Sequence, residues 1–177
     1  DNNLANDTPL DTMAATYTIM SSGGQVEYQS CLVGYPFDNT HLNWRKASME
    51  RRNSPTPLNY NPEANKDLAY GTFIMMGLQI KQPFHVNGNE NILYLSFSTQ
   101  GHENIKLSFA VKDEGAADAI IAEYWDDQKN QWTSALLPAI SYNIWSSYQV
   151  VEIDFSNVAE AANNPNFQCR LRFHGIN

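Results

Sequence analysis

The chain has 177 residues, enough for one domain of ordinary size with its own core. Hydrophobic residues make up 42% and charged residues only 17%, which excludes a disordered chain and a charge-rich coiled coil. Eleven Lys and Arg against nineteen Asp and Glu give a net charge of −8, so no nucleic acid or anionic membrane surface is expected as partner. The sequence has no apolar run of about 18 residues, and no membrane span is expected.

The first 16 residues are rich in Asn, Asp and Thr and show no sustained apolar period. Residues 1–16 are therefore predicted to be a lead-in or linker, and residues 17–177 a single domain. The chain begins without Met and without a basic and apolar leader. We therefore expect a trimmed mature chain or an excised module from which any export signal is already absent.

From Tyr17 onward, apolar residues recur mostly at every second position, as in strands with one buried and one solvated face. The predicted strands are residues 26–33, 72–81, 92–98, 105–112, 119–125, 149–155 and 167–173. Breaks such as Asn87-Gly88-Asn89 and Gln100-Gly101 suit hairpin turns. This pattern predicts an all-β fold, a jelly-roll β-sandwich of two antiparallel sheets. Its predicted core consists of Ile105, Leu107, Phe109, Val111, Val151, Ile153, Phe155, Phe167, Leu171 and Phe173.

Helix is expected only at residues 157–162, as one or two turns with Ser156 as the N-cap and Asn163-Asn164-Pro165 as the stop. No amphipathic segment of 10 to 15 residues separates the strands. This disfavours parallel βαβ architecture and its dinucleotide sites.

One long irregular loop is predicted between residues 36 and 68, and loops of this length carry function or cover a core. Four of the eleven positive charges, Arg45, Lys46, Arg51 and Arg52, lie within eight residues of this loop, which also holds Trp44 and Tyr60. Forked guanidinium contacts could bind the carboxylate or sulfate of an acidic glycan. The alternative is that Arg51 and Arg52 pair internally and hold the loop on the sandwich. The candidate carboxylates for such pairing are Glu50, Asp113 and Glu114.

Aromatic side chains are the second group of candidate site residues. Trp132 and Trp145 lie in polar, turn-like surroundings and are predicted to be exposed, and one of Tyr124 and Trp125 must face outward. Such rings stack on the C–H faces of sugars. The alternative is that they pack in the core or at its rim, as many rings in sandwiches do.

Clustered carboxylates after the strand at residues 105–112 form a candidate metal site. Asp113, Glu114 and Asp118 could hold a structural calcium ion, although their spacing does not match an EF-hand loop. The alternative is solvated turn charges. For hydrolysis, the candidate carboxylates are Glu50, Asp113, Glu114 and Asp126. No hydrolase motif accompanies them and the four histidines are isolated, so no catalytic residue is assigned.

Cys31 and Cys169 are the two cysteines of the chain. Neither has a second cysteine or a histidine at zinc-ligand spacing, so zinc is not expected. Each is predicted to be a buried free thiol that packs as a small hydrophobe, and the alternative is one disulfide between them.

Four segments carry a resemblance to a known group of proteins: residues 51–60, 76–84, 108–118 and 163–173. They resemble β-sandwich, jelly-roll modules of exported, often multidomain proteins from Gram-negative gut-type and marine bacteria. Members are similar in architecture to carbohydrate-binding and galactose-binding-like domains, and no catalytic motif is known for the group. The resemblance covers roughly residues 70–175. It implies a secreted or cell-surface location, tethering to other domains and a monomeric module.

The sequence thus predicts a non-catalytic carbohydrate-binding module that requires no cofactor and recognises a glycan by stacking and polar contacts. The candidate ligand-binding residues are Trp44, Arg51, Arg52, Tyr60, Trp132 and Trp145. The alternatives are a structural or protein-interaction accessory domain, and a glycan-active lyase or hydrolase on a jelly roll.

Overall fold

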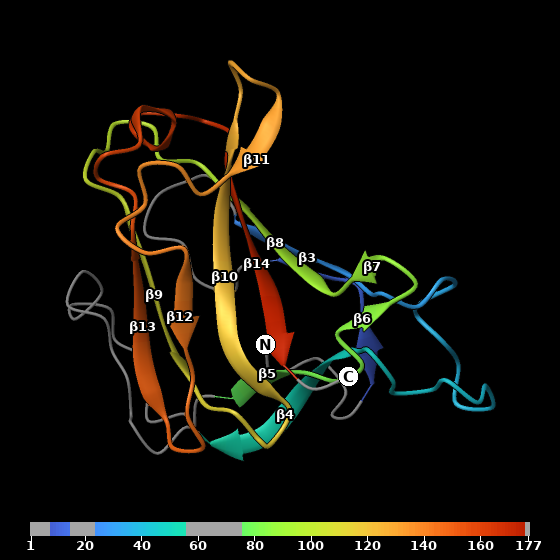
Figure 1. Ribbon diagram of the computed structural model, residues 1–177. Helices are drawn as coiled ribbons and strands as arrows, with labels where there is room; N and C mark the ends of the chain where they lie inside the picture. Colours follow the sequence, from blue (N-terminus) through green and yellow to red (C-terminus); the bar gives the residue numbers. More distant parts are fainter. Residues whose placement is uncertain (1–7, 15–23, 56–75, 176–177) are drawn as a thin grey trace.

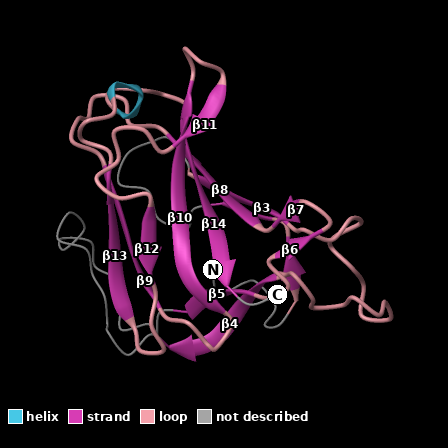
Figure 2. Ribbon diagram, viewed as in Figure 1, coloured by secondary structure: helices cyan, strands magenta, loops and turns pink. Residues whose placement is uncertain are grey.

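The computed structural model describes residues 8–14, 24–55 and 76–175, and within them antiparallel strands dominate (Figures 1 and 2). The largest sheet has seven strands. Its path runs β11-β10-β14-β8-β3-β2, and β12 pairs with β10 beside that path. Its strands are β2 (Thr12–Ala14), β3 (Gln25–Gln29), β8 (Ile92–Phe97), β10 (Ala117–Asp126), β11 (Gln131–Thr133), β12 (Ser141–Asn143) and β14 (Phe167–Gly175).

A second layer faces this sheet. It consists of the antiparallel pair β9 (Lys106–Val111) and β13 (Gln149–Asp154), which lie side by side to the left of β10 in Figure 1. The inward residues of both layers form one hydrophobic core, with Ile153, Phe155 and Phe167 almost fully buried. All ten predicted core residues lie in this core or pack against it, so the predicted all-β sandwich is confirmed.

Two small sheets complete the described structure. One contains β1 (Pro9–Leu10), β4 (Met49–Pro55) and β5 (Met76–Ile80), and the other is the hairpin of β6 (His85–Val86) and β7 (Asn89–Glu90). Asn87 and Gly88 connect this hairpin with positive φ angles of 51° and 83°, as the Asn-Gly signal predicted.

Two segments contain more strand than their composition predicted. Residues 9–14, in the predicted lead-in, form β1 and β2, so ordered structure begins before Tyr17. The stretch predicted to be irregular between residues 36 and 68 contains β4. Met49 and Glu50 are both fully buried there, so β4 lacks the alternation of apolar and polar residues that marks a strand.

The predicted helix at residues 157–162 is a single 3₁₀ turn, η2 (Ala159–Ala161). Its N-cap is Val158 without a side-chain cap, so the prediction of Ser156 as N-cap is wrong. Ser156 instead donates its backbone N–H to Oδ1 of Asp154 at 2.8 Å, which closes a turn directly after β13.

Both cysteines are buried and free, which confirms the prediction of packed thiols and excludes the disulfide. Cys169 lies in the core, where burial raises the pKa of its thiol to about 12. The Cys31 thiol donates to the carbonyl of Pro83 at 3.3 Å. Neither sulfur has the exposed, electropositive surroundings that make a thiol reactive.

Candidate functional site

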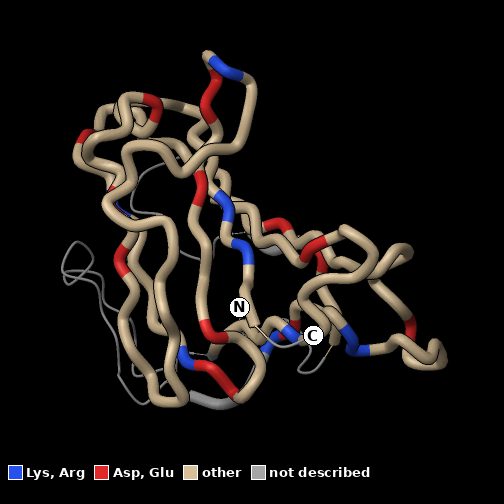
Figure 3. Tube along the Cα trace, viewed as in Figure 1, with Lys and Arg blue, Asp and Glu red and all other residues tan. Residues whose placement is uncertain are grey.

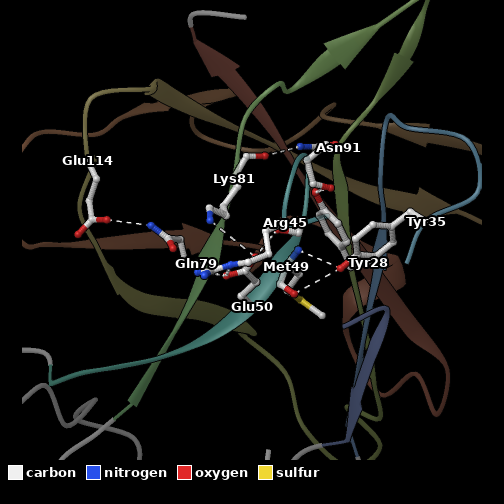
Figure 4. A network of polar contacts seen from close by, with 11 residues as sticks. Tyr28, Tyr35, Arg45, Met49, Glu50, Gln79, Lys81, Asn91 and Glu114 are labelled. Atoms are coloured by element: carbon white, nitrogen blue, oxygen red, sulfur yellow. Dashed lines mark hydrogen bonds and ion pairs between the residues drawn. The ribbon is translucent and has the colours of Figure 1, made fainter. Parts of the chain in front are cut away.

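The predicted basic loop is held by internal pairing. Glu50 has no exposed surface, and its carboxylate accepts hydrogen bonds from Nε and Nη2 of Arg45 and from Oγ of Ser48, at 2.7 to 3.1 Å (Figure 4). The ammonium of Lys81 lies 3.7 Å away. The fork of Arg45 is therefore occupied by a protein carboxylate, and Glu50 pairs with Arg45 and Lys81.

The other predicted residues of this loop are described only in part. Trp44 is 39% exposed and contacts the guanidinium of Arg45 at 5.6 Å from its ring centroid. Arg51 is half-buried on β4. The side chain of Arg52 and the whole of Tyr60 lie outside the described residues.

The three carboxylates of the predicted metal site have separate partners. Asp113 accepts hydrogen bonds from the backbone N–H groups of residues 115, 116 and 117 at 2.7 to 2.8 Å. Burial alone would raise the pKa of Asp113, but these hydrogen bonds outweigh it and lower that pKa. Glu114 binds the ammonium of Lys112 at 2.8 Å, and Asp118 binds His174. Among the described residues, no group of three or more His, Cys, Asp and Glu side chains is arranged to hold a metal ion.

Trp145 is the most exposed tryptophan and borders a shallow hollow of about 510 Å³ where β10, β12 and β14 meet. The indole is 60% exposed. Nδ1 of His174 and Oδ1 of Asp118 are 2.6 Å apart beside it, and both side chains are about two-thirds exposed. The hollow is lined by Asp118, Ala119, Ile121, Ser141, Asn143, Ile144, Trp145 and His174. An exposed ring is thus surrounded by hydroxyl, amide, carboxylate and imidazole groups.

Main-chain hydrogen bonds fix the position of Trp145. Its carbonyl accepts from the N–H of Asp113 at 2.7 Å, and the N–H of Ile144 donates to the carbonyl of Asp118 at 2.9 Å. On the other side of the hollow, the end of β14 approaches the turn after β9 very closely. A Cβ on Gly175 would lie 2.0 Å from the carbonyl oxygen of Ala116, so only glycine fits there. These main-chain contacts tie the segment of Trp145 to β10 and to the turn after β9.

Trp132 belongs to a cluster of rings at the other end of β10. Its ring centroid lies 5.4 Å from that of Trp125 and 5.6 Å from that of Tyr94. The guanidinium of Arg170 lies 4.7 Å from the Trp132 centroid and donates to Glu123 at 2.6 Å. As predicted for one of the pair, Trp125 faces outward while Tyr124 is buried in the core. We call Tyr94, Trp125, Trp132, Arg170 and Glu123 the aromatic cluster.

A second ion pair extends the aromatic cluster across the sheet. Arg172 forms two hydrogen bonds with the carboxylate of Glu90, at 2.5 and 2.9 Å, and lies 3.5 Å from Glu123. Figure 3 shows basic and acidic segments side by side where β10 and β14 run together. Each charge on this part of the sheet therefore has an opposite charge as a neighbour.

The Glu90–Arg172 pair predicts a measurable dependence of stability on acid. The hydrogen bond from Arg172 lowers the pKa of Glu90 below its usual value of 4.5, against the opposing effect of burial. This stabilisation is present above the unfolded-state pKa and is lost as the pH falls through the folded-state value. Glu90→Gln should therefore remove about 0.5–1 kcal/mol at pH 7, and the difference from wild type should shrink as the pH falls below 4.5, measured by urea unfolding. In an Arg172→Gln background the same change should have almost no effect, and an equal effect there would contradict the pairing.

A second concavity lies between β5 and the turn after β9. This cleft of about 350 Å³ has core residues such as Phe84 and Ile144 in its floor. Its polar lining includes Gln79, whose amide donates to Glu114 at 2.9 Å. The ring of Tyr148 is half-buried and lies 5.3 Å from the ammonium of Lys112. The cleft therefore offers less open ring surface than the hollow beside Trp145.

The predicted site residues do not lie in one place. Trp145 and Asp118, from two different predicted sites, lie together in the hollow, and Trp132 lies in the aromatic cluster. The sequence interpretation missed Tyr94, Arg170 and His174 as site residues. Arg170 and Arg172 stand on the outward side of a period-two strand, and that signal could have found them.

The fold and this site define a class of protein: an antiparallel β-sandwich whose large sheet carries rings and paired charges on its outer face. Comparisons with known protein families, with curated protein sequences and with solved structures found no match. The described residues include no helix long and apolar enough to cross a membrane.

Proposed function

We propose that this domain is a non-catalytic carbohydrate-binding module and that its ligand binds in the hollow beside Trp145. The observation that carries the proposal is a ring with 60% exposure beside a hollow whose lining combines apolar surface with the polar side chains of Ser141, Asn143, Asp118 and His174. Covering an exposed indole face with a ligand removes apolar surface from water and is favourable. A sugar ring covers such a face with its C–H groups while its hydroxyls hydrogen-bond to the polar rim.

The residues of the rim fit hydroxyl groups. Asn143 and Ser141 offer donors and acceptors, Asp118 offers acceptors, and His174 can do either according to its tautomer. Binding would be a simple equilibrium, weak at one site and strengthened by tethering to neighbouring domains. A module of this kind, on a jelly-roll sandwich, would act outside the cell or on its surface.

Carbohydrate binding is tested by an affinity-gel and glycan-array screen of the wild-type domain and two tryptophan variants. Trp145→Ala is expected to lower affinity about tenfold or more, equivalent to about 1.4 kcal/mol, because the stacking surface is lost. The matched control is Trp44→Ala, which removes an exposed ring outside the hollow and should leave affinity unchanged. Equal losses in both variants, or in neither, would show that the hollow is not the site.

The same screen, repeated with a chelator, tests the calcium prediction. A structural calcium ion held by Asp113, Glu114 and Asp118 would make binding or thermal stability fall in the chelator. The partners of these carboxylates, namely three backbone N–H groups, Lys112 and His174, favour no change in either quantity.

An interaction domain is the second candidate, and a specific observation favours it. The segment at residues 31–48 exposes Val33 to 88% and Leu42 to 78%, and both could contact another protein. A well-folded sample that binds no glycan would favour this function. Enzymatic activity has less support, because Glu50 is buried in an ion pair and Asp113 is engaged by the main chain.

A further inference from the structure

The hollow and the aromatic cluster lie on one face of the seven-stranded sheet. Ile120, Ala122 and Tyr124 of β10 point into the core. Because side chains alternate along a strand, Ala119, Ile121, Glu123 and Trp125 point to the opposite, outer face. Of these four, only Ala119 is fully buried.

The cross-strand register extends this outer face on both sides of β10. At the hollow, Ala119 stands between Asn143 of β12 and His174 of β14. At the aromatic cluster, Trp125 stands opposite Trp132 of β11. The face therefore carries an exposed or half-exposed tryptophan at each end of β10.

Charged side chains fill the interval between the two ends. Arg172 stands beside Ile121, and Arg170 stands beside Glu123. Their guanidinium and carboxylate groups are 14% to 27% exposed and present both donors and acceptors to the solvent. Polar contacts are thus available along the whole interval.

The length of the interval decides which ligand can use both ends. Six steps along β10 lead from Ala119, at the hollow, to Trp125, at the aromatic cluster, and at about 3.3 Å per residue they span about 20 Å. A disaccharide is too short to cover this length of the strand. A linear chain of several sugar units can.

The charges of the face decide the chemical class of that ligand. Arg170 and Arg172 are each bound to a carboxylate, so each pair has a net charge of zero. An acidic glycan would have to displace Glu123 or Glu90 and would also be repelled by the net charge of −8. Hydroxyl groups can join the existing pairs without breaking them.

We infer that the hollow and the aromatic cluster are two ends of one binding track along β10, and that the track binds a neutral, linear oligosaccharide. This inference rests on the proposed function and specifies its ligand. Binding at both ends of one chain adds the two contributions, so affinity should rise with chain length.

The test is a calorimetric length series on the wild-type domain. The probes are neutral β-linked gluco-, xylo- and manno-oligosaccharides of two and six units, with uronic-acid oligosaccharides of the same lengths. The best neutral six-unit chain should bind at least about tenfold more tightly than its two-unit counterpart. Trp132→Ala should remove this gain and leave two-unit affinity unchanged, whereas Trp145→Ala should weaken both. Thermal unfolding checks that each variant is folded.

Each contrary result has a distinct meaning. Equal affinity for two and six units would overturn the track while leaving the hollow as a glycan site. Tighter binding of the uronic-acid chains would overturn the assignment of a neutral ligand. Failure of every oligosaccharide to bind would overturn the proposed function and the track with it. The wild-type series gives these answers even if Trp132→Ala does not fold.

Discussion

Asn91→Ala is expected to destabilise the domain by about 4 kcal/mol, because three main-chain groups lose a buried hydrogen-bond partner at once. The side chain of Asn91 is 1% exposed and makes three hydrogen bonds with the main chain. Its amide donates to the carbonyl of Lys81 at 3.1 Å (Figure 4) and to that of Pro83 at 2.9 Å. Its oxygen accepts from the N–H of Cys31 at 2.8 Å. Alanine would leave all three main-chain groups without this partner. Two of them, the carbonyls of Lys81 and Pro83, lie on the segment after β5.

The measurement is urea unfolding of the Asn91→Ala variant beside a matched control, Asn89→Ala. Asn89 is an exposed residue of β7 two positions away, and its loss should cost less than about 0.5 kcal/mol. Asn91→Asp keeps the acceptor for Cys31 but replaces the amide donor, and it should also destabilise the fold. A cost below about 1 kcal/mol for Asn91→Ala would contradict the assigned role of this side chain.

Glu50→Gln is expected to cost about 3 kcal/mol. Glu50 is completely buried, and the change removes the negative charge that the Arg45 guanidinium and the Lys81 ammonium face. Breaking a buried pair leaves a charge without compensation, which is more costly than the pair itself is stabilising. The side chains of Arg45 and Lys81 are 25% and 29% exposed, so water can solvate part of the charge that the change leaves unpaired. The expected cost therefore lies at the lower end of the range for broken buried ion pairs.

The matched control for Glu50→Gln is Glu152→Gln. Glu152 also pairs with a lysine, Lys106 at 2.9 Å, but its side chain is 52% exposed. Exposed pairs contribute little, so this variant should lose less than about 1 kcal/mol in urea unfolding. Equal free energies of unfolding for the two variants would show that burial of Glu50 does not determine its effect.

Period-two alternation made most of the sandwich predictable. Lys106, Ser108, Glu152 and Asp154 mark the outward side of β9 and β13, and all of the predicted core residues of these strands are in place. β4 gave no such signal, because a fully buried carboxylate occupies a strand position that normally carries an apolar residue. The sequence shows that Glu50 is acidic, but it does not show which arginine pairs with it.

The candidate site was predictable only in part, for a related reason. Polar neighbours in the sequence correctly indicated that Trp145 is exposed. Tyr94 gave no signal, because β8 carries apolar residues on both sides of the strand. Its contact with Trp132 joins strands that are not neighbours in the sequence. The charge of the basic loop predicted a ligand site there. The guanidinium of Arg45 is instead paired with a carboxylate within the protein.

Coverage of Trp145 by a glycan is tested most directly by the indole N–H signals of the four tryptophans. Each signal is assigned in nuclear magnetic resonance spectra by substituting one tryptophan at a time. The tightest neutral six-unit oligosaccharide is then added to the wild-type domain. We expect the Trp145 signal to shift most, the Trp132 signal to shift with it, and the Trp44 signal to stay in place. A shift confined to Trp44, or no shift at Trp145, would contradict glycan binding in the hollow.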